Sequence, residues 1–158
     1  MKIAITGHRP NKLGNDYSLT SPLLLHIKAI LQEQINIYQP EFMISGMALG
    51  IDTLWATLAI ENNIKLIAAV PFKSQHIKWT IKSQEIYFDL LSKAHQMINI
   101  SGADGYNLDY MQLRNEWMVD NCDMLIAVWD GTPGGTCNCF RYANKRNKNI
   151  FRINPSLI

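Results

Sequence analysis

Three segments of this sequence place glycine beside residue types that bind anions. The first is Thr-Gly-His-Arg-Pro at 6–10, where Gly7 lets the chain turn sharply and brings Arg9 beside the amides that follow. A cation beside free backbone amides can hold a phosphate or a carboxylate. His8 in this segment is either a general acid or base, or a loop side chain that makes one structural hydrogen bond.

The second segment, Ser-Gly-Met-Ala-Leu-Gly-Ile-Asp at 45–52, spaces two glycines before a predicted helix. Free amides and the helix dipole at such a junction favour an anion. The spacing matches neither a Walker A loop nor a dinucleotide-binding fingerprint. Asp52 has two possible roles. Its negative charge either stabilises the helix N-terminus, or its carboxylate contacts ribose hydroxyls or acts as a base.

The third segment, Asp-Gly-Thr-Pro-Gly-Gly-Thr at 130–136, holds three glycines and a proline between an apolar run and another predicted helix. This much backbone freedom favours a phosphate-binding loop, with Thr136 as a helix cap or a phosphate-binding hydroxyl. Arg114 lies early in the predicted helix 108–121 and is either a surface arginine or a planar cation above the loops. Asn115 and Glu116 follow it and can add polar contacts.

The elements that must position these segments alternate along the chain. Apolar, β-branched runs predict strands at 2–6, 42–45, 65–70, 96–100, 123–129 and 149–153. Helical spacing predicts helices at 23–38, 51–62, 108–121 and 136–145, with one or two more within 73–94. This alternation predicts a single α/β domain over 1–158, with a Rossmann-like, doubly wound, mostly parallel sheet covered by helices on both faces. Ligands bind such sheets at the carboxyl ends of the strands, where all three segments fall.

Composition narrows the function further. With 158 residues, 47% hydrophobic and 18% charged, the chain is predicted to be globular rather than disordered. A net charge of +2 and the lack of a basic stripe argue against nucleic-acid binding, and the late basic residues favour a solvated helix face. The three cysteines form no metal-ligand pattern and suit a reducing compartment. We therefore expect a cytoplasmic protein with no metal, no other cofactor and no membrane span.

Taken together, the motifs resemble the YpsA-related branch of the SLOG superfamily, which includes the DNA-processing protein SMF (DprA) and the LONELY GUY phosphoribohydrolases. The resemblance rests on 6–10 with Lys-Leu-Gly at 12–14, on 45–52, on Arg-Asn-Glu at 114–116, and on Asp-Gly at 130–131 with Gly-Gly-Thr at 134–136. It covers nearly the whole chain in order. It implies a Rossmann-like domain that binds a nucleotide or a nucleotide-derived ligand.

The resemblance to the LONELY GUY enzymes is incomplete where those enzymes carry out catalysis. Residues 111–115 resemble their Met-x-x-Arg-Lys segment, with Asn115 in place of lysine. Residues 133–139 resemble their Pro-Gly-Gly-x-Gly-Thr-x-x-Glu loop, but the loop is shorter, and Cys139 stands where the catalytic glutamate would fall. Glycosidic cleavage passes through an oxocarbenium-like state that a nearby carboxylate stabilises. The phosphate-binding half of the site is thus retained, and the hydrolytic half is altered.

The leading hypothesis is that this chain binds a nucleotide or a nucleotide-derived small molecule. The residues expected to contact it are Gly7, His8, Arg9, Ser45, Gly46, Met47, Ala48, Gly50, Asp52, Arg114, Asn115, Asp130, Gly131, Gly134, Gly135, Thr136 and Asn138. The alternative is an N-glycosidase acting on nucleoside 5′-monophosphates, with Arg114 and either Glu116 or Asp52 as its catalytic residues. Single-stranded DNA binding is a third hypothesis, against which the near-neutral charge argues. By resemblance the chain forms a dimer, and the segment around Trp79, Tyr87 and Phe88 is either a surface for the second copy or core.

Overall fold

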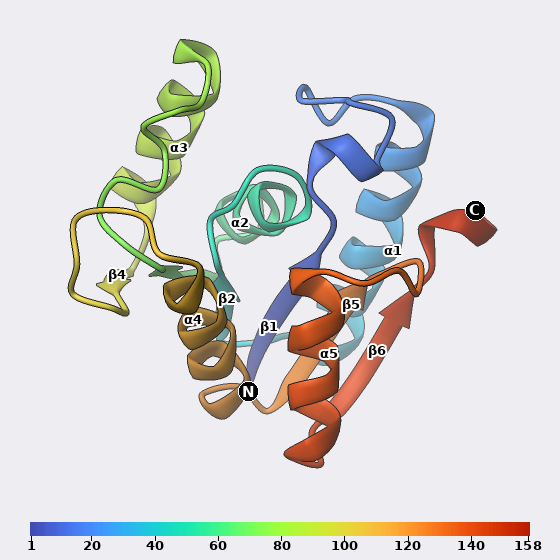
Figure 1. Ribbon diagram of the computed structural model, residues 1–158. Helices are drawn as coiled ribbons and strands as arrows, with labels where there is room; N and C mark the ends of the chain where they lie inside the picture. The colour runs from blue at the N-terminus through green and yellow to red at the C-terminus, as the bar shows by residue number, and fades with distance from the viewer.

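One six-stranded parallel sheet organises the protein, for which a computed structural model describes residues 1–158 (Figure 1). The strands are β1 (Lys2–Gly7), β2 (Phe42–Ser45), β3 (Lys65–Val70), β4 (Gln96–Asn99), β5 (Met124–Val128) and β6 (Asn149–Ile153). The helices are α1 (Pro22–Tyr38), α2 (Ile51–Glu61), α3 (Ile81–Lys93), α4 (Leu108–Asp120) and α5 (Gly135–Lys145), with short 3-10 turns at Pro10–Lys12 and Pro155–Leu157. This arrangement confirms the predicted Rossmann-like α/β class.

The strand order β4-β3-β2-β1-β5-β6 reverses direction between β1 and β5. These two strands pair in register from Ile3 with Met124 to Gly7 with Val128, so they end side by side. Two loops leave the sheet at this point: the β1 loop (residues 8–21) and the β5 loop (residues 129–134). Parallel α/β sheets form a crevice where the strand order reverses, and the position of both loops follows from the topology.

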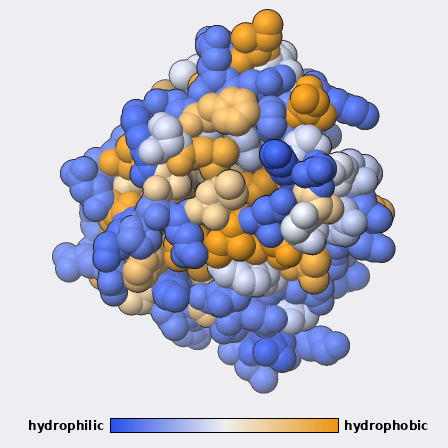
Figure 2. All heavy atoms as spheres, turned by 90° about the vertical axis from the view of Figure 1, so that its left-hand side faces the viewer, coloured by the Kyte–Doolittle hydropathy of each residue, from blue (hydrophilic) through white to orange (hydrophobic).

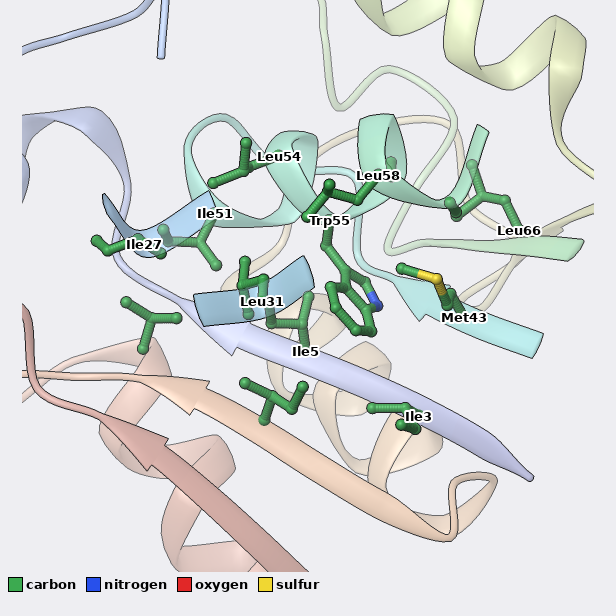
Figure 3. Packing of buried hydrophobic residues seen from close by; sticks show 14 of the residues in the cluster. Ile3, Ile5, Ile27, Leu31, Met43, Ile51, Leu54, Trp55, Leu58 and Leu66 are labelled. Atoms are coloured by element: carbon green, nitrogen blue, oxygen red, sulfur yellow. The ribbon is translucent and has the colours of Figure 1, made fainter. Parts of the chain in front are cut away.

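Helices cover both faces of the sheet, and β1 shows how its residues divide between them. Ile3 and Ile5 face a core cluster shared with α1, α2 and part of α3, whereas Ala4 faces a second cluster shared with α4 and α5. In the first cluster, the indole of Trp55 points from α2 onto the sheet beside Leu31 (Figure 3). Burial of each such large apolar side chain contributes about 1.5–3 kcal/mol to folding. Both faces of the strands are therefore apolar, as parallel sheets require.

The helix starts are set by local capping chemistry. Ser21 caps α1, whose first residue is Pro22, and Thr80 caps α3 by accepting a hydrogen bond from the Ser83 amide. One helix lies within 73–94, where one or two were expected, and the cap at Thr80 sets its start, because residues 73–78 form turns and the helix begins at Ile81. No helix is both long enough and apolar enough to cross a membrane.

The aromatic segment before and within α3 divides between core and surface. Tyr87 is buried, whereas Phe88 is exposed, and both rings pack against the imidazole of His76. Trp79 is partly buried and meets Tyr87 edge-on. Figure 2 shows the side of the molecule that carries α3, β4 and α4, where hydrophobic side chains gather inside a hydrophilic margin.

Candidate functional site

A cleft of about 350 Å³ lies at the carboxyl ends of β1 and β5. Its lining comes from the β1 loop, the β5 loop, the starts of α2, α4 and α5, and the residue pair that ends β1. The helices α4 and α5 lie side by side and begin at the same edge of the sheet (Figure 1). The cleft therefore opens between two helix N-termini at the point where the strand order reverses.

The structure brings ten of the predicted ligand residues into this lining: Gly7, His8, Arg9, Ala48, Asp52, Arg114, Asn115, Gly134, Gly135 and Thr136. The predicted residues outside the lining are Ser45, Gly46, Met47, Gly50, Asp130, Gly131, Asn138 and Glu116. Ten further residues line the cleft and were not predicted to contact the ligand, although some of them lie in the segments that carry the family resemblance: Thr6, Asn11, Lys12, Tyr106, Leu108, Met111, Met118, Thr132, Pro133 and Cys137.

The N-terminus of α5 presents free backbone amides to the cleft. Gly134 occupies the cap position at φ 145°, a left-handed conformation that favours glycine, and no side chain caps the helix. The first hydrogen bond of α5 runs from the Asn138 amide to the Gly134 carbonyl, so the amides of Gly135, Thr136 and Cys137 have no helical partner. The positive end of the helix dipole adds to their attraction for negative charge. This end of the cleft is suited to an anion.

Lys12 carries a positive charge to the same end of the cleft. Its Nζ donates to Thr132 Oγ1 at 2.9 Å and to the Pro133 carbonyl at 3.1 Å, so it joins the β1 loop to the β5 loop. Arg9, from the same loop, is exposed and also lines the cleft. Lys12 thus lies beside the start of α5, and Arg9 adds a second positive charge to the cleft.

In the glycine segment after β2, residues 46–50, two backbone amides donate hydrogen bonds inside the protein. The Met47 amide donates to Ser45 Oγ at 3.1 Å, and the Ala48 amide donates to Asp52 Oδ2 at 3.3 Å. The first amide of α2, on Ile51, donates to the His8 carbonyl at 3.3 Å. A Cβ on Gly50 would lie 2.6 Å from that carbonyl oxygen, so the β1 loop packs closely against the N-terminus of α2. The two predicted glycine cradles therefore differ: the first amide of α2 already has a partner in the protein, whereas the first three amides of α5 have none.

Arg114 and Asp52 form the buried floor of the cleft. Arg114 Nη1 donates to the carbonyls of Gly46 and Ala69, and its Nε donates to Asn115 Oδ1 at 2.9 Å. Burial lowers the pKa of the Arg114 guanidinium, and the Asp52 carboxylate opposes that shift. Burial likewise raises the pKa of Asp52, and Arg114 opposes this. The two charges stabilise each other at the base of the site without a direct hydrogen bond.

His8 and Asp130 fasten the β1 loop to the β5 loop. His8 Nε2 lies 2.9 Å from Asp130 Oδ1, and the Asp130 amide donates to the same nitrogen at 3.1 Å. Asp130 Oδ1 also accepts from the amide and hydroxyl of Thr132 at 2.9 and 2.6 Å, which is the main reason that its pKa is lowered. Burial lowers the pKa of His8, with Asp130 opposing. These contacts give His8 a bracing position between the two loops.

Asp52 is the acidic side chain that lines the cleft. Glu116 lies away from it on α4, near Tyr142 of α5. Cys139, at the position where the LONELY GUY glutamate would fall, is fully buried, and burial raises its pKa to about 12. Neither Glu116 nor Cys139 supplies charge to the cleft in this fold.

Some of the lining residues that were not predicted had a recognisable signal in the sequence, and others had none. Lys12 lies two residues after Pro10, but its contact with Thr132 spans 120 residues and leaves no trace in local spacing. Tyr106 and Leu108 flank Asn107, whose side chain caps α4 by accepting from the Asp109 amide. A helix N-cap with apolar residues on both sides, in a loop that follows a strand, could have indicated that Tyr106 and Leu108 line the cleft.

Comparison with known proteins places the chain in a family. The YpsA family model, described as the YspA SLOG family, matches residues 3–156. The SPbeta prophage-derived protein YoqJ of Bacillus subtilis strain 168 is 31% identical over 87% of this chain and 92% of its own length.

Solved structures agree on the fold. The DNA processing protein A (DprA) of Streptococcus pneumoniae has a TM-score of 0.68 at 17% identity, and covers 97% of this chain. The chain spans only 50% of that structure's own length. DprA from Helicobacter pylori, whose structure concerns its binding of single-stranded DNA, has a TM-score of 0.68 at 18% identity, over 96% of this chain and 64% of its own. On its family match and its likeness to YoqJ, the chain belongs to the YpsA SLOG family.

Proposed function

We propose that the cleft binds a nucleotide or a nucleotide-derived small molecule, with its phosphate at the N-terminus of α5. The observation that carries this proposal is the convergence of three anion-attracting features: the free amides of residues 135–137, Lys12 and Arg9. Helix N-termini with adjacent cations are effective phosphate sites because each amide donates a hydrogen bond and the dipole adds to the field.

The floor of the cleft suits the sugar of such a ligand. Asp52 Oδ2 already accepts from the Ala48 amide, and its carboxyl group faces a cleft in which no other acidic side chain takes part. A carboxylate oxygen accepts hydrogen bonds from ribose hydroxyls in the way that it accepts from any alcohol. Arg114 donates hydrogen bonds to Gly46 and Asn115, and its positive charge favours the ionised form of Asp52. A cleft of this size falls within the range of small-molecule sites.

Calorimetry with nucleoside 5′-monophosphates, NAD and ADP-ribose tests the proposal. Gly135→Asp puts a negative charge among the α5 amides and is expected to weaken binding at least tenfold. Gly135→Ala is its matched control, because a Cβ at Gly135 meets open space and adds no charge. Lys12→Met removes the cation while keeping its aliphatic stem, and is expected to weaken binding by roughly tenfold. If no compound of the panel binds, or if the aspartate variant binds like the alanine variant, the proposed phosphate site is wrong.

A second candidate function is cleavage of the N-glycosidic bond of a nucleoside 5′-monophosphate. The observation that favours it is the position of Asp52, a buried carboxyl group in the cleft whose pKa is raised by burial. Such a group can stabilise an oxocarbenium-like transition state or activate water. Chromatography for free base after incubation with the same nucleotides tests this, with Asp52→Asn expected to abolish release. Nucleotide binding without release of base from any substrate would leave binding as the function.

A further inference from the structure

The two sides of the cleft differ in chemistry. The α5 side carries free backbone amides. Beside them, Lys12 joins the β1 loop to the β5 loop. The opposite side, at the start of α4, lines the cleft with Tyr106, Leu108 and Met111, and Asp109 in the same turn is not part of the lining. One end of the cleft therefore attracts an anion, and the other offers apolar and aromatic surface.

Tyr106 is exposed to an unusual degree for an aromatic side chain that lines a cleft. Its side chain is 69% exposed, and its one aromatic neighbour is Phe72, which meets it edge-on at 5.8 Å between ring centroids. Leu108, two residues further, is 70% exposed. An edge-on partner leaves a ring face open, and aromatic faces of this kind stack on nucleobases. Neither side chain contributes to the two core clusters.

The backbone around Tyr106 is held in place before any ligand arrives. The amides of Lys73 and Ser74 donate to the carbonyls of Ala103 and Asp104 at 3.0 and 2.9 Å. Asn99 Nδ2 also donates to the Ala103 carbonyl at 3.0 Å. On the other side of Tyr106, Asn107 caps α4. The wall of Tyr106, Leu108 and Met111 (the α4 wall) is thus set by hydrogen bonds on both sides, so a ligand that uses it pays little ordering entropy.

From these observations we infer that the α4 wall is the base-binding side of the cleft, with the nucleobase stacked on Tyr106 and packed against Leu108. The inference rests on the proposed function and extends it. It assigns the ligand class as nucleotides that keep their base, rather than sugar phosphates or free phosphate. It also fixes the orientation of the ligand, with its phosphate at the α5 amides and its sugar over Asp52.

The experiment compares ligands that share a phosphate and differ in the base. Calorimetry is run with adenosine 5′-monophosphate, ribose 5-phosphate and inorganic phosphate on the wild-type chain and on Tyr106→Ala, Tyr106→Phe and Tyr38→Ala. Tyr38 is an exposed tyrosine at the end of α1, outside the cleft, and serves as the matched control. A single-stranded oligodeoxynucleotide is the fourth ligand, because stacking on aromatic side chains also serves nucleic acids.

The expected result is that Tyr106→Ala weakens adenosine monophosphate binding roughly 5- to 100-fold, the range typical of one lost base stack. Its affinity for ribose 5-phosphate should stay within about twofold of wild type, and Tyr106→Phe and Tyr38→Ala should bind the nucleotide like wild type. Equal losses for ribose 5-phosphate, no loss for the nucleotide, or a loss confined to the oligonucleotide would each overturn the inference. Failure of the proposed function looks different: the wild-type chain would bind none of the phosphate compounds, or Gly135→Asp would leave their binding unchanged.

Discussion

The carbonyl of Gly46 accepts a hydrogen bond from Arg114 Nη1, and the space between the two residues has no room for a side chain. A Cβ on Gly46 would lie 2.6 Å from Arg114 Cζ and 2.8 Å from Asp52 Oδ2. The glycine that looked like part of a phosphate cradle in the sequence is needed instead so that a buried arginine can approach the backbone. This contact joins the end of β2 to α4 and sets the depth of the cleft floor.

We predict that Gly46→Ala destabilises the fold by about 1–3 kcal/mol, the usual cost of overpacking a buried site. The added methyl group displaces the Arg114 guanidinium from its carbonyl partners and moves it relative to Asp52. Urea denaturation at pH 7 measures the loss. Gly105→Ala is the control, because a Cβ there meets nothing within 4 Å. Equal stability of the Gly46→Ala variant and the wild type would show that Arg114 is not confined as described.

The pH dependence of stability reports on Asp52. Burial raises its folded-state pKa above the ordinary value of 3.8, so the unfolded chain releases this proton at lower pH than the folded chain does. The stability that Asp52 contributes is present in full below pH 3.8 and is lost as the pH rises through the raised pKa. We therefore expect Asp52→Asn to gain stability relative to wild type as the pH rises from about 4 towards neutrality.

Chemical denaturation across that range measures this gain. Glu33→Gln, an exposed acid-to-amide change on α1, is the matched control for the removal of a carboxylate. A loss of stability of Asp52→Asn relative to wild type as the pH rises would contradict a raised pKa for Asp52.

Titration of His8 by NMR tests the brace between the β1 and β5 loops. We predict a His8 pKa below 6.5, because burial disfavours its charged form. Its contribution to stability is present above pH 6.5 and is lost as the pH falls through the lowered pKa. Asp130→Asn removes the carboxylate that opposes the shift, so the pKa of His8 should fall further in this variant. A pKa above 6.5 in the wild type, or a rise in Asp130→Asn, would contradict this arrangement.

Most of the fold was predictable because its signals are local. The run Met-Leu-Ile-Ala-Val at 124–128 is apolar on both faces and was expected as a buried strand, as it is in β5. One helix within 73–94 was expected as one of two possibilities, but its start was not predicted from the spacing of polar and aromatic residues. The Thr80 cap, a single side-chain contact, decides that the helix begins at Ile81.

The site was predictable in part, and the limit is one of distance along the chain. The sequence marks glycine loops at strand ends, and the topology brings those after β1 and β5 together. The sequence does not show which of these loops packs against another and takes up its backbone amides. The His8 carbonyl that receives the Ile51 amide, and the Lys12 contact with Thr132, join residues far apart in sequence. Both contacts depend on the assembled sheet, which residue spacing alone does not describe.

The closed and open glycine loops also differ in how freely they can change. Gly46 is confined by Arg114 and Asp52, and Gly50 by the His8 carbonyl, so a substitution at either glycine disturbs the framework that positions the floor. A Cβ on Gly135 meets open space, whereas Gly134 has φ 145°, a conformation that favours glycine. Position 135 can therefore change, and with it the charge beside the anion site, while the rest of the molecule keeps its structure. Within one architecture, this separates the evolution of ligand preference from the maintenance of the fold.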